Sequence, residues 1–190
     1  MEAKTDTRHD VIIAGVGGTG SMVIGQVLAA AGMSEYEYTL WNPSMTMARR
    51  NAPADCVTVL SKEPIGSPLL ATAESVIMTE SSRLKVFEPK VHSGGYLILE
   101  SSGLQDEVGR DDVKVLKVPG VQIAASIGNT LARNMVLLGA YIATVKAVSP
   151  EAIEQEIKKK YSQNEKVQAL NTRAFWEGVK LVTEQGKAPV

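Results

Sequence analysis

The sequence contains very few of the residues that hold metals or form disulfides. It has one cysteine, Cys56, and two histidines, His9 and His92, in 190 residues. One cysteine excludes an intramolecular disulfide and a cysteine-ligated iron–sulfur cluster built by this chain alone, and it favours a reducing cytoplasm. Neither histidine has an HxxH or HxxE neighbour. We therefore expect both to be solvated loop residues rather than metal ligands or general bases.

Excess charge and long apolar runs are also missing. The formal net charge is −1 and charged residues make up 22% of the chain, so no long-range field attracts nucleic acid or an anionic membrane. The most apolar window, residues 134–148, is too short to span a bilayer and predicts a buried helix. The first six residues lack the apolar stretch of a secretory signal. We expect a cytoplasmic globular protein with no nucleic-acid or membrane partner.

A glycine-rich turn follows the first apolar run. The segment Gly15-Val-Gly17-Gly18-Thr19-Gly20 fits GxGxxG and leads directly into a helical pattern. Such a turn brings backbone N–H groups close to an anion at a helix N-terminus. A nicotinamide site also needs a carboxylate at the end of the second strand, where this chain has Asn42. We favour a tight turn or a non-dinucleotide anion contact, and keep a stand-alone NAD(P)- or nucleotide-binding protein as the alternative.

Apolar runs and breakers predict the remaining organisation. We interpret residues 1–190 as a single domain with residues 1–9 flexible, an irregular loop opened by Pro43, and a turn-rich loop from Pro64 to Pro68. Strands are predicted near 11–14, 38–41, 56–60, 75–78, 96–99 and 113–118, and helices near 19–31, 81–87 and 121–148 (broken near 128–129). Two further helices are predicted from 149, with the Ser149 hydroxyl as the cap, and from 162, where Ser162–Glu165 resembles a capping box. This pattern predicts an α/β fold, a three-layer α/β/α sandwich with a Rossmann-like, mostly parallel sheet and a helical C-terminal part.

Two polar features lie outside the glycine turn. Arg49 and Arg50 form a pair that can bind a carboxylate or a phosphate, or simply lie solvated at the surface. Cys56 lies in an alternating apolar run, where a cysteine usually packs as a small hydrophobe. No GxSxG elbow, metal-ligand cluster or other complete catalytic site is visible, so the sequence predicts no catalytic or metal-binding residue of its own.

Four stretches in the same order resemble one family, the gamma subunit or gamma domain of 2-oxoacid:ferredoxin oxidoreductases. This family includes the pyruvate, ketoisovalerate, 2-oxoglutarate and indolepyruvate enzymes. The matching stretches are residues 15–20, 56–68 (CVTVLSKEPIGSP), 128–139 with Gly128-Asn129 and Asn134–Gly139, and 170–174. Two departures stand out. Thr19 replaces the family's glutamine, and Asn51 and Ala52 replace two glycines beside the family's arginine, which corresponds to Arg50.

The resemblance implies a subunit that is not catalytic alone. Alpha, beta and ferredoxin-like delta subunits would carry thiamine diphosphate, magnesium and iron–sulfur clusters. The whole complex would convert a 2-oxoacid and coenzyme A into acyl-CoA and carbon dioxide, and would reduce ferredoxin. Within this chain, Gly15, Gly17, Gly18, Thr19, Gly20 and Arg50 would face a partner subunit or an anion. An isolated chain with its partners missing is also a candidate homodimer.

Overall fold

The computed structural model describes residues 7–45 and 52–185. Its strands are β1 (Arg8–Ala14), β2 (Tyr38–Met45), β3 (Ala54–Ser61), β4 (Ala73–Met78), β5 (Val91–Glu100) and β6 (Lys114–Val118). Its α-helices are α1 (Ser21–Gly32), α2 (Leu84–Phe87), α3 (Gly120–Ser126), α4 (Arg133–Val145), α5 (Pro150–Lys160) and α6 (Glu165–Gln185). Short 3₁₀ turns lie at Ser81–Arg83, Glu88–Lys90 and Thr130–Ala132.

The six strands form one mixed sheet in the order β2-β3-β1-β4-β5-β6. The pairs β1–β4, β4–β5 and β5–β6 are parallel, whereas β3 runs antiparallel to both β1 and β2. The predicted α/β fold is therefore confirmed, with most neighbouring pairs parallel. The main departure from a Rossmann-like order is that antiparallel β3 lies between β1 and β2. In a Rossmann-like sheet the strand after the first helix, here β2, pairs directly with strand one.

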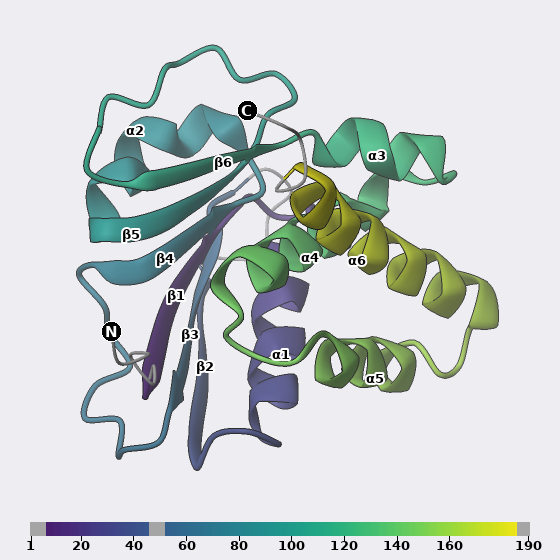
Figure 1. Ribbon diagram of the computed structural model, residues 1–190, viewed down its shortest axis with the longest axis horizontal. Helices are drawn as coiled ribbons and strands as arrows, with labels where there is room; N and C mark the ends of the chain where they lie inside the picture. The colour runs from purple at the N-terminus through teal and green to yellow at the C-terminus, as the bar shows by residue number, and fades with distance from the viewer. Residues whose placement is uncertain (1–6, 46–51, 186–190) are drawn as a thin grey trace.

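Alternation along β1 divides the core between the two faces of the sheet. Val11 and Ile13 belong to the larger cluster, which includes residues of α1, α4, α5 and α6. Ile12 and Ala14 belong to the smaller cluster, which includes Leu84 and Phe87 of α2. Figure 1 shows the same arrangement, with the long helices beside one face of the sheet and α2 beside the other. The helical layer on that second face consists of α2 and its flanking 3₁₀ turns.

Helices α4 and α6 pack closely together where each helix has a glycine. A Cβ added to Gly139 of α4 would lie 2.0 Å from the Phe175 carbonyl oxygen, and one added to Gly178 of α6 would lie 2.0 Å from the Val136 carbonyl oxygen. Each glycine thus faces the backbone of the opposite helix, which cannot swing away as a flexible side chain can. The pair brings the C-terminal helix into direct backbone contact with the buried helix α4.

Three local expectations were wrong. Pro43 lies within β2 and does not end it, because β2 is an edge strand and an edge strand tolerates a missing ladder donor. The Ser149 hydroxyl donates to Glu35 rather than capping α5. The start of α6 is capped by Asn164, whose side-chain oxygen accepts the Val167 N–H at 3.1 Å, and not by Ser162.

The N-terminal histidine also differs from expectation. His9 lies in β1, is 2% exposed, and its Nδ1 is 2.8 Å from Glu74 Oε2 on β4. Residues 8 and 9 therefore belong to the sheet instead of a loose tail, and His9 is a buried, paired group. His92 is exposed, as expected, but it lies in β5 and not in a loop, and it contacts the Thr72 hydroxyl at 2.8 Å.

Candidate functional site at the carboxyl ends of the strands

The glycine turn connects β1 to α1 at the carboxyl end of the parallel strands, where α/β proteins bind ligands. A Cβ on Gly15 would lie 2.5 Å from Thr79 Oγ1 and 2.6 Å from Ser21 Cβ. Gly20 has a φ of +80°, and a Cβ there would lie 2.5 Å from Asn134 Nδ2. Gly15 is therefore needed for space, and Gly20 for both space and backbone conformation. The turn therefore lets α1 pack closely against β4 and α4.

Several backbone amides of the turn are already used inside the chain. The Gly15 N–H donates to Asp55 Oδ1 at 3.1 Å, and the Gly17 N–H donates to the Ala52 carbonyl at 2.8 Å. The Thr19 N–H donates to the Val16 carbonyl at 3.2 Å. Gly18, with φ of 91°, is the exposed tip of the turn. An incoming anion would therefore meet fewer free donors here than in an open phosphate-binding loop.

An ion pair that the sequence analysis missed anchors the turn. Arg83, from the 3₁₀ turn after β4, donates hydrogen bonds to both carboxylate oxygens of Asp55 at the start of β3. The same guanidinium donates to the Gly15 carbonyl at 2.7 Å and lies 4.6 Å from the centre of the Phe87 ring. Asp55 and Arg83 therefore hold both the N–H and the carbonyl of Gly15. The two residues are 28 positions apart, and no spacing rule pairs them.

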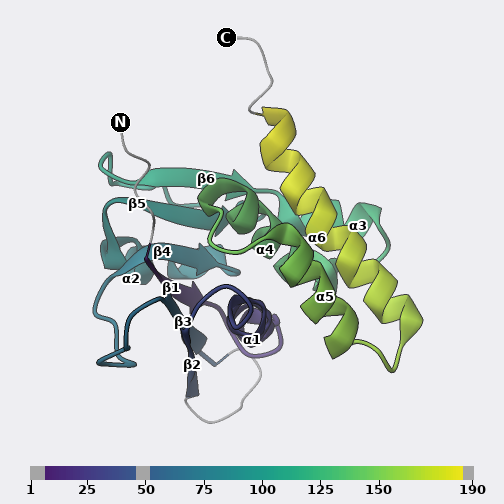
Figure 2. The ribbon, with the colours of Figure 1, turned by 60° about the horizontal axis from the view of Figure 1, so that its bottom comes forward.

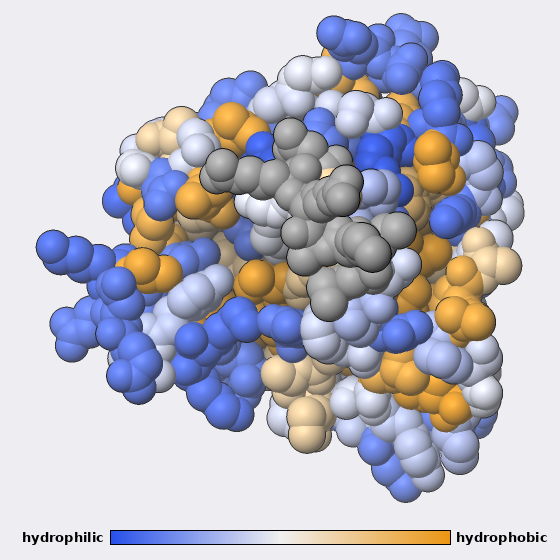
Figure 3. All heavy atoms as spheres, turned by 180° about the vertical axis from the view of Figure 1, so that it is seen from behind, coloured by the Kyte–Doolittle hydropathy of each residue, from blue (hydrophilic) through white to orange (hydrophobic). Residues whose placement is uncertain are grey.

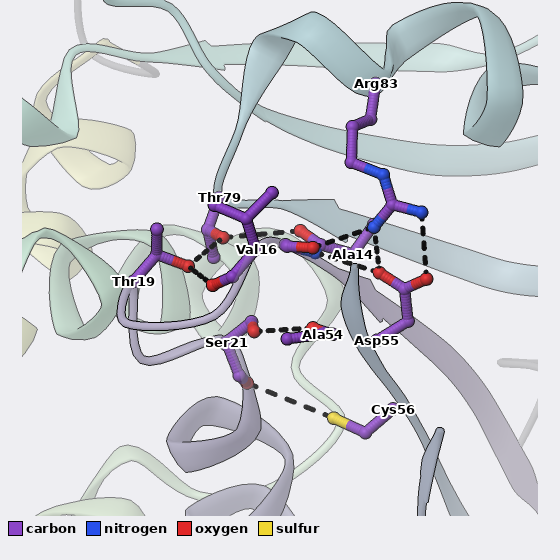
Figure 4. A network of polar contacts seen from close by, with 10 residues as sticks. Ala14, Val16, Thr19, Ser21, Ala54, Asp55, Cys56, Thr79 and Arg83 are labelled. Atoms are coloured by element: carbon purple, nitrogen blue, oxygen red, sulfur yellow. Dashed lines mark hydrogen bonds and ion pairs between the residues drawn. The ribbon is translucent and has the colours of Figure 1, made fainter. Parts of the chain in front are cut away.

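Hydroxyl groups complete the network (Figure 4). Thr19 Oγ1 donates to the Val16 carbonyl at 2.7 Å and lies 3.2 Å from Thr79 Oγ1. Ser21 Oγ donates to the Ala54 carbonyl at 2.7 Å. Within the described part of the chain, none of these hydroxyls is hydrogen-bonded to a histidine or a carboxylate that would make it a nucleophile. The network is suited to fixing the shape of the turn rather than to bond making.

Cys56 is buried behind this network. Its sulfur and the Trp41 indole both lie against Gly25 of α1, and its thiol contacts the Ser21 carbonyl oxygen at 3.9 Å. Burial raises the pKa of the thiol to about 12, although the Trp41 indole partly opposes this effect. A thiolate is the reactive form of cysteine, so Cys56 is inert at neutral pH. The interpretation of Cys56 as a packed small hydrophobe is confirmed.

This raised pKa predicts a pH dependence of stability. Between pH 9 and pH 12 the folded thiol keeps its proton while the unfolded thiol, with an ordinary pKa near 9.0, loses it. The unfolded state then binds fewer protons, so stability falls by up to about 1.4 kcal/mol per pH unit as pH rises. Urea denaturation at pH 8.5, 9.5 and 10.5 should show a steeper decline for the wild type than for Cys56→Val. Equal slopes would contradict the assignment.

Asp55 also borders a small cavity on the face that carries α2. The cavity has a volume of about 200 Å³ and lies between β2, β3, the segment Pro68–Leu70 and α2. Its polar lining residues are Asn42, Ser44, Asp55 and Lys90. The Lys90 ammonium lies 4.5 Å from the centre of the Phe87 ring. Arg49 and Arg50, the predicted anion-binding pair, lie outside the described residues.

The described residues do not supply a metal centre. No group of three or more histidine, cysteine, aspartate or glutamate side chains in ranges 7–45 and 52–185 is placed to hold a metal ion. The same part of the chain contains no helix that is both long and apolar enough to cross a membrane.

Comparison with known proteins decides the family. The model of the pyruvate ferredoxin/flavodoxin oxidoreductase family matches residues 10–181. The chain belongs to this family. The resemblance found in the four sequence stretches is thereby confirmed.

Two relatives align with nearly all of this chain but over different shares of their own length. Ketoisovalerate oxidoreductase subunit VorA of Methanothermobacter thermautotrophicus is 30% identical over 175 residues, which are 92% of this chain and 36% of VorA. The chain thus spans about a third of that relative. The 2-oxoglutarate synthase subunit KorC of Methanothermobacter marburgensis is 27% identical over 187 residues, which are 95% of this chain and 100% of KorC.

Solved structures share the fold. The gamma subunit of a keto/oxoacid ferredoxin oxidoreductase from Geobacter sulfurreducens superposes with a TM-score of 0.76 at 18% identity, covering 93% of this chain and 99% of that subunit. A 2-oxoglutarate:ferredoxin oxidoreductase from Magnetococcus marinus superposes with a TM-score of 0.83 at 21% identity, covering 94% of this chain and 32% of that one.

The alternative of a stand-alone NAD(P)-binding protein is not supported. The family match points to the oxidoreductase subunits. The sheet order gives the physical reason, because antiparallel β3 lies between β1 and β2. Asn42 therefore lies on an edge strand, two strands from the glycine turn's strand, and not where a dinucleotide ribose is held.

Proposed function

We propose that this chain is a gamma-type subunit of a 2-oxoacid:ferredoxin oxidoreductase of the cytoplasm. The complex would oxidatively decarboxylate a 2-oxoacid with coenzyme A as co-substrate and pass the electrons to ferredoxin. The family match over residues 10–181 carries this proposal. The alignment to KorC, which covers the whole of that subunit, supports a chain of this size as one subunit.

The subunit would provide a shaped docking surface. Gly15, Gly17, Gly18, Thr19 and Gly20 would present this surface to a partner subunit or an anion, together with Arg50. The pair Asp55–Arg83 supports the idea because it fixes the turn without offering a free reactive group. Rigid loops of this kind suit a surface that must match a partner with little reorganisation.

The cysteine content of this chain does not fit the iron–sulfur clusters of such a complex. An iron–sulfur cluster needs several cysteine thiolates, and the single thiol here is buried with its pKa raised to about 12. We therefore assign thiamine diphosphate, magnesium and the iron–sulfur clusters to the alpha, beta and delta subunits. Without those companions we expect the isolated chain to form a homodimer.

Affinity purification from the native host tests the assignment. A tagged copy of the chain is expected to recover its companions in fixed proportion, with thiamine diphosphate and iron in the eluate. Mass spectrometry identifies the proteins, and fluorescence of oxidised thiamine and iron analysis measure the cofactors. A tagged chain that elutes alone, at native expression level and without thiamine or iron, would contradict the proposal.

A further inference from the structure

The outer edge of β2 has no strand beside it. β2 pairs with β3 on one side only, and Figure 2 shows β2 and β6 at opposite margins of the sheet. On its outer side the backbone of residues 38–45 forms no hydrogen bond with another described residue. Its outward N–H and carbonyl groups are therefore a template for another strand.

The two edges of the sheet differ in protection. β6 has five residues, two of which, Lys114 and Lys117, are lysines that discourage strand pairing. β2 has eight residues, and the segment from Tyr36 to Met45 carries one charge, Glu37. Pro43 lacks an N–H and interferes only near the end of the strand. Residues 38–42 are thus an uncharged, unprotected pairing segment.

A groove and an exposed apolar side chain lie beside this edge. The groove has a volume of about 400 Å³ and is lined by Met33, Ile65 and residues 36–40. Met33 follows the end of α1 and is 73% exposed. An isologous, two-fold interface uses the same surface of both copies, so each copy contributes a protruding side chain and a groove to receive one. Met33 and the neighbouring groove provide these two features on one surface.

The charge pattern also permits self-pairing. An antiparallel, two-fold pair of β2 strands centred on Leu40 places Glu37 opposite Pro43 of the second copy. The two Glu37 side chains are then about 20 Å apart, at 3.4 Å per residue, which is beyond the Debye length of about 8 Å at physiological ionic strength. The like charges therefore do not oppose the pairing.

We propose that β2 pairs antiparallel with β2 of a second copy of this chain, joining two sheets into one and seating each Met33 in the partner's groove. This inference names the surface for the homodimer given under the proposed function. If the chain is monomeric, the proposed dimer surface is wrong. The assignment to the oxidoreductase complex does not depend on this result, because recovery of the companions tests it.

Substitution of Met33 gives the sharpest test. Met33→Glu places a carboxylate in a groove that already contains Glu37, so the dissociation constant of the dimer should rise at least tenfold. The control is Leu131→Glu, on the 3₁₀ turn before α4, where Leu131 is 67% exposed; it should change the constant less than twofold. Sedimentation equilibrium of the whole chain from 1 to 200 µM measures both. Far-UV circular dichroism verifies that each variant is folded.

Hydrogen exchange locates the interface independently. Amides in residues 38–42 should exchange more slowly at 200 µM than at 1 µM, whereas those in β6 should show no concentration dependence. A chain that stays monomeric at 200 µM overturns the proposal. So does a dimer that is indifferent to Met33→Glu and protected elsewhere. A wild type that never self-associates, but whose Met33→Glu variant fails to join its companions, also overturns it and assigns this edge to another subunit.

Discussion

Replacing Gly139 with alanine is expected to destabilise the protein strongly, with a loss of about 2–3 kcal/mol in the free energy of unfolding. In an isolated helix this change would be favourable by about 1 kcal/mol. Here the new methyl group would lie 2.0 Å from the Phe175 carbonyl oxygen, so α4 and α6 must separate. Gly178→Ala should behave in the same way, because its Cβ would meet the Val136 carbonyl at 2.0 Å.

Urea denaturation followed by circular dichroism measures this loss. Gly66→Ala is the matched control, because no heavy atom of a described residue, its chain neighbours apart, lies within 4 Å of a Cβ at that position. Its stability should remain within about 0.5 kcal/mol of the wild type. The double variant Gly139→Ala/Gly178→Ala should lose less than the sum of the single variants, since one separation of the helices relieves both clashes. A Gly139→Ala protein as stable as the wild type would contradict the close crossing.

Breaking the pair Asp55–Arg83 is expected to have the second large effect. Arg83→Met leaves the Asp55 carboxylate half-buried, with the Gly15 N–H as its remaining partner among the described residues, and it removes the donor to the Gly15 carbonyl. We expect a loss of about 1–3 kcal/mol, below the cost for a fully buried pair because the side chains remain 17% and 21% exposed. Asp55→Asn should cost a similar amount.

A double-mutant cycle separates the pair from its surroundings. The coupling energy between Asp55→Asn and Arg83→Met should be about 1–2 kcal/mol. The exposed pair Lys180–Glu184 on α6 is the control, and its coupling energy should be less than about 0.5 kcal/mol. Because Asp55 and Arg83 also shape the glycine turn, Arg83→Met should weaken assembly with the companion subunits under conditions where the chain is still folded. Additive stability effects, or assembly of unchanged strength, would contradict the anchoring role.

The sequence predicted the elements whose signal is local. The predicted apolar runs lie inside the observed β1, β4 and β5, although β1 and β5 begin earlier than predicted. The periodic pattern of α1 and the break between α3 and α4 at Gly128-Asn129 were predicted at nearly the observed positions. Local hydrophobic patterns determine which face of such an element is buried. The α/β class follows from their alternation.

What the sequence could not predict depends on the order of the strands. Pro43 was expected to end a strand, and only the position of β2 at the sheet edge shows why it does not. His9 has no partner close to it in the sequence, and it contacts Glu74 because β1 and β4 are paired neighbours in the sheet. The pairing of Asp55 with Arg83 and the contact of Gly20 with Asn134 are likewise products of the packed fold. The role of Arg50 remains a prediction.

The surface seen in Figure 3 is consistent with a protein that binds partners at particular loops or edges. Hydrophobic residues there form several separate patches between hydrophilic ones, rather than one continuous apolar face. A complex that joins such surfaces relies on shaped contacts, of which the glycine turn is our candidate.

Reconstitution from separate subunits tests the central claim most directly. The rate of 2-oxoacid-dependent, coenzyme A-dependent reduction of a viologen dye is measured for the companions alone, for this chain alone and for the mixture. We predict activity in the mixture at least tenfold above the companions alone, and no turnover by this chain alone. Turnover by the homogeneous chain, or full activity of the companions without it, would contradict the account.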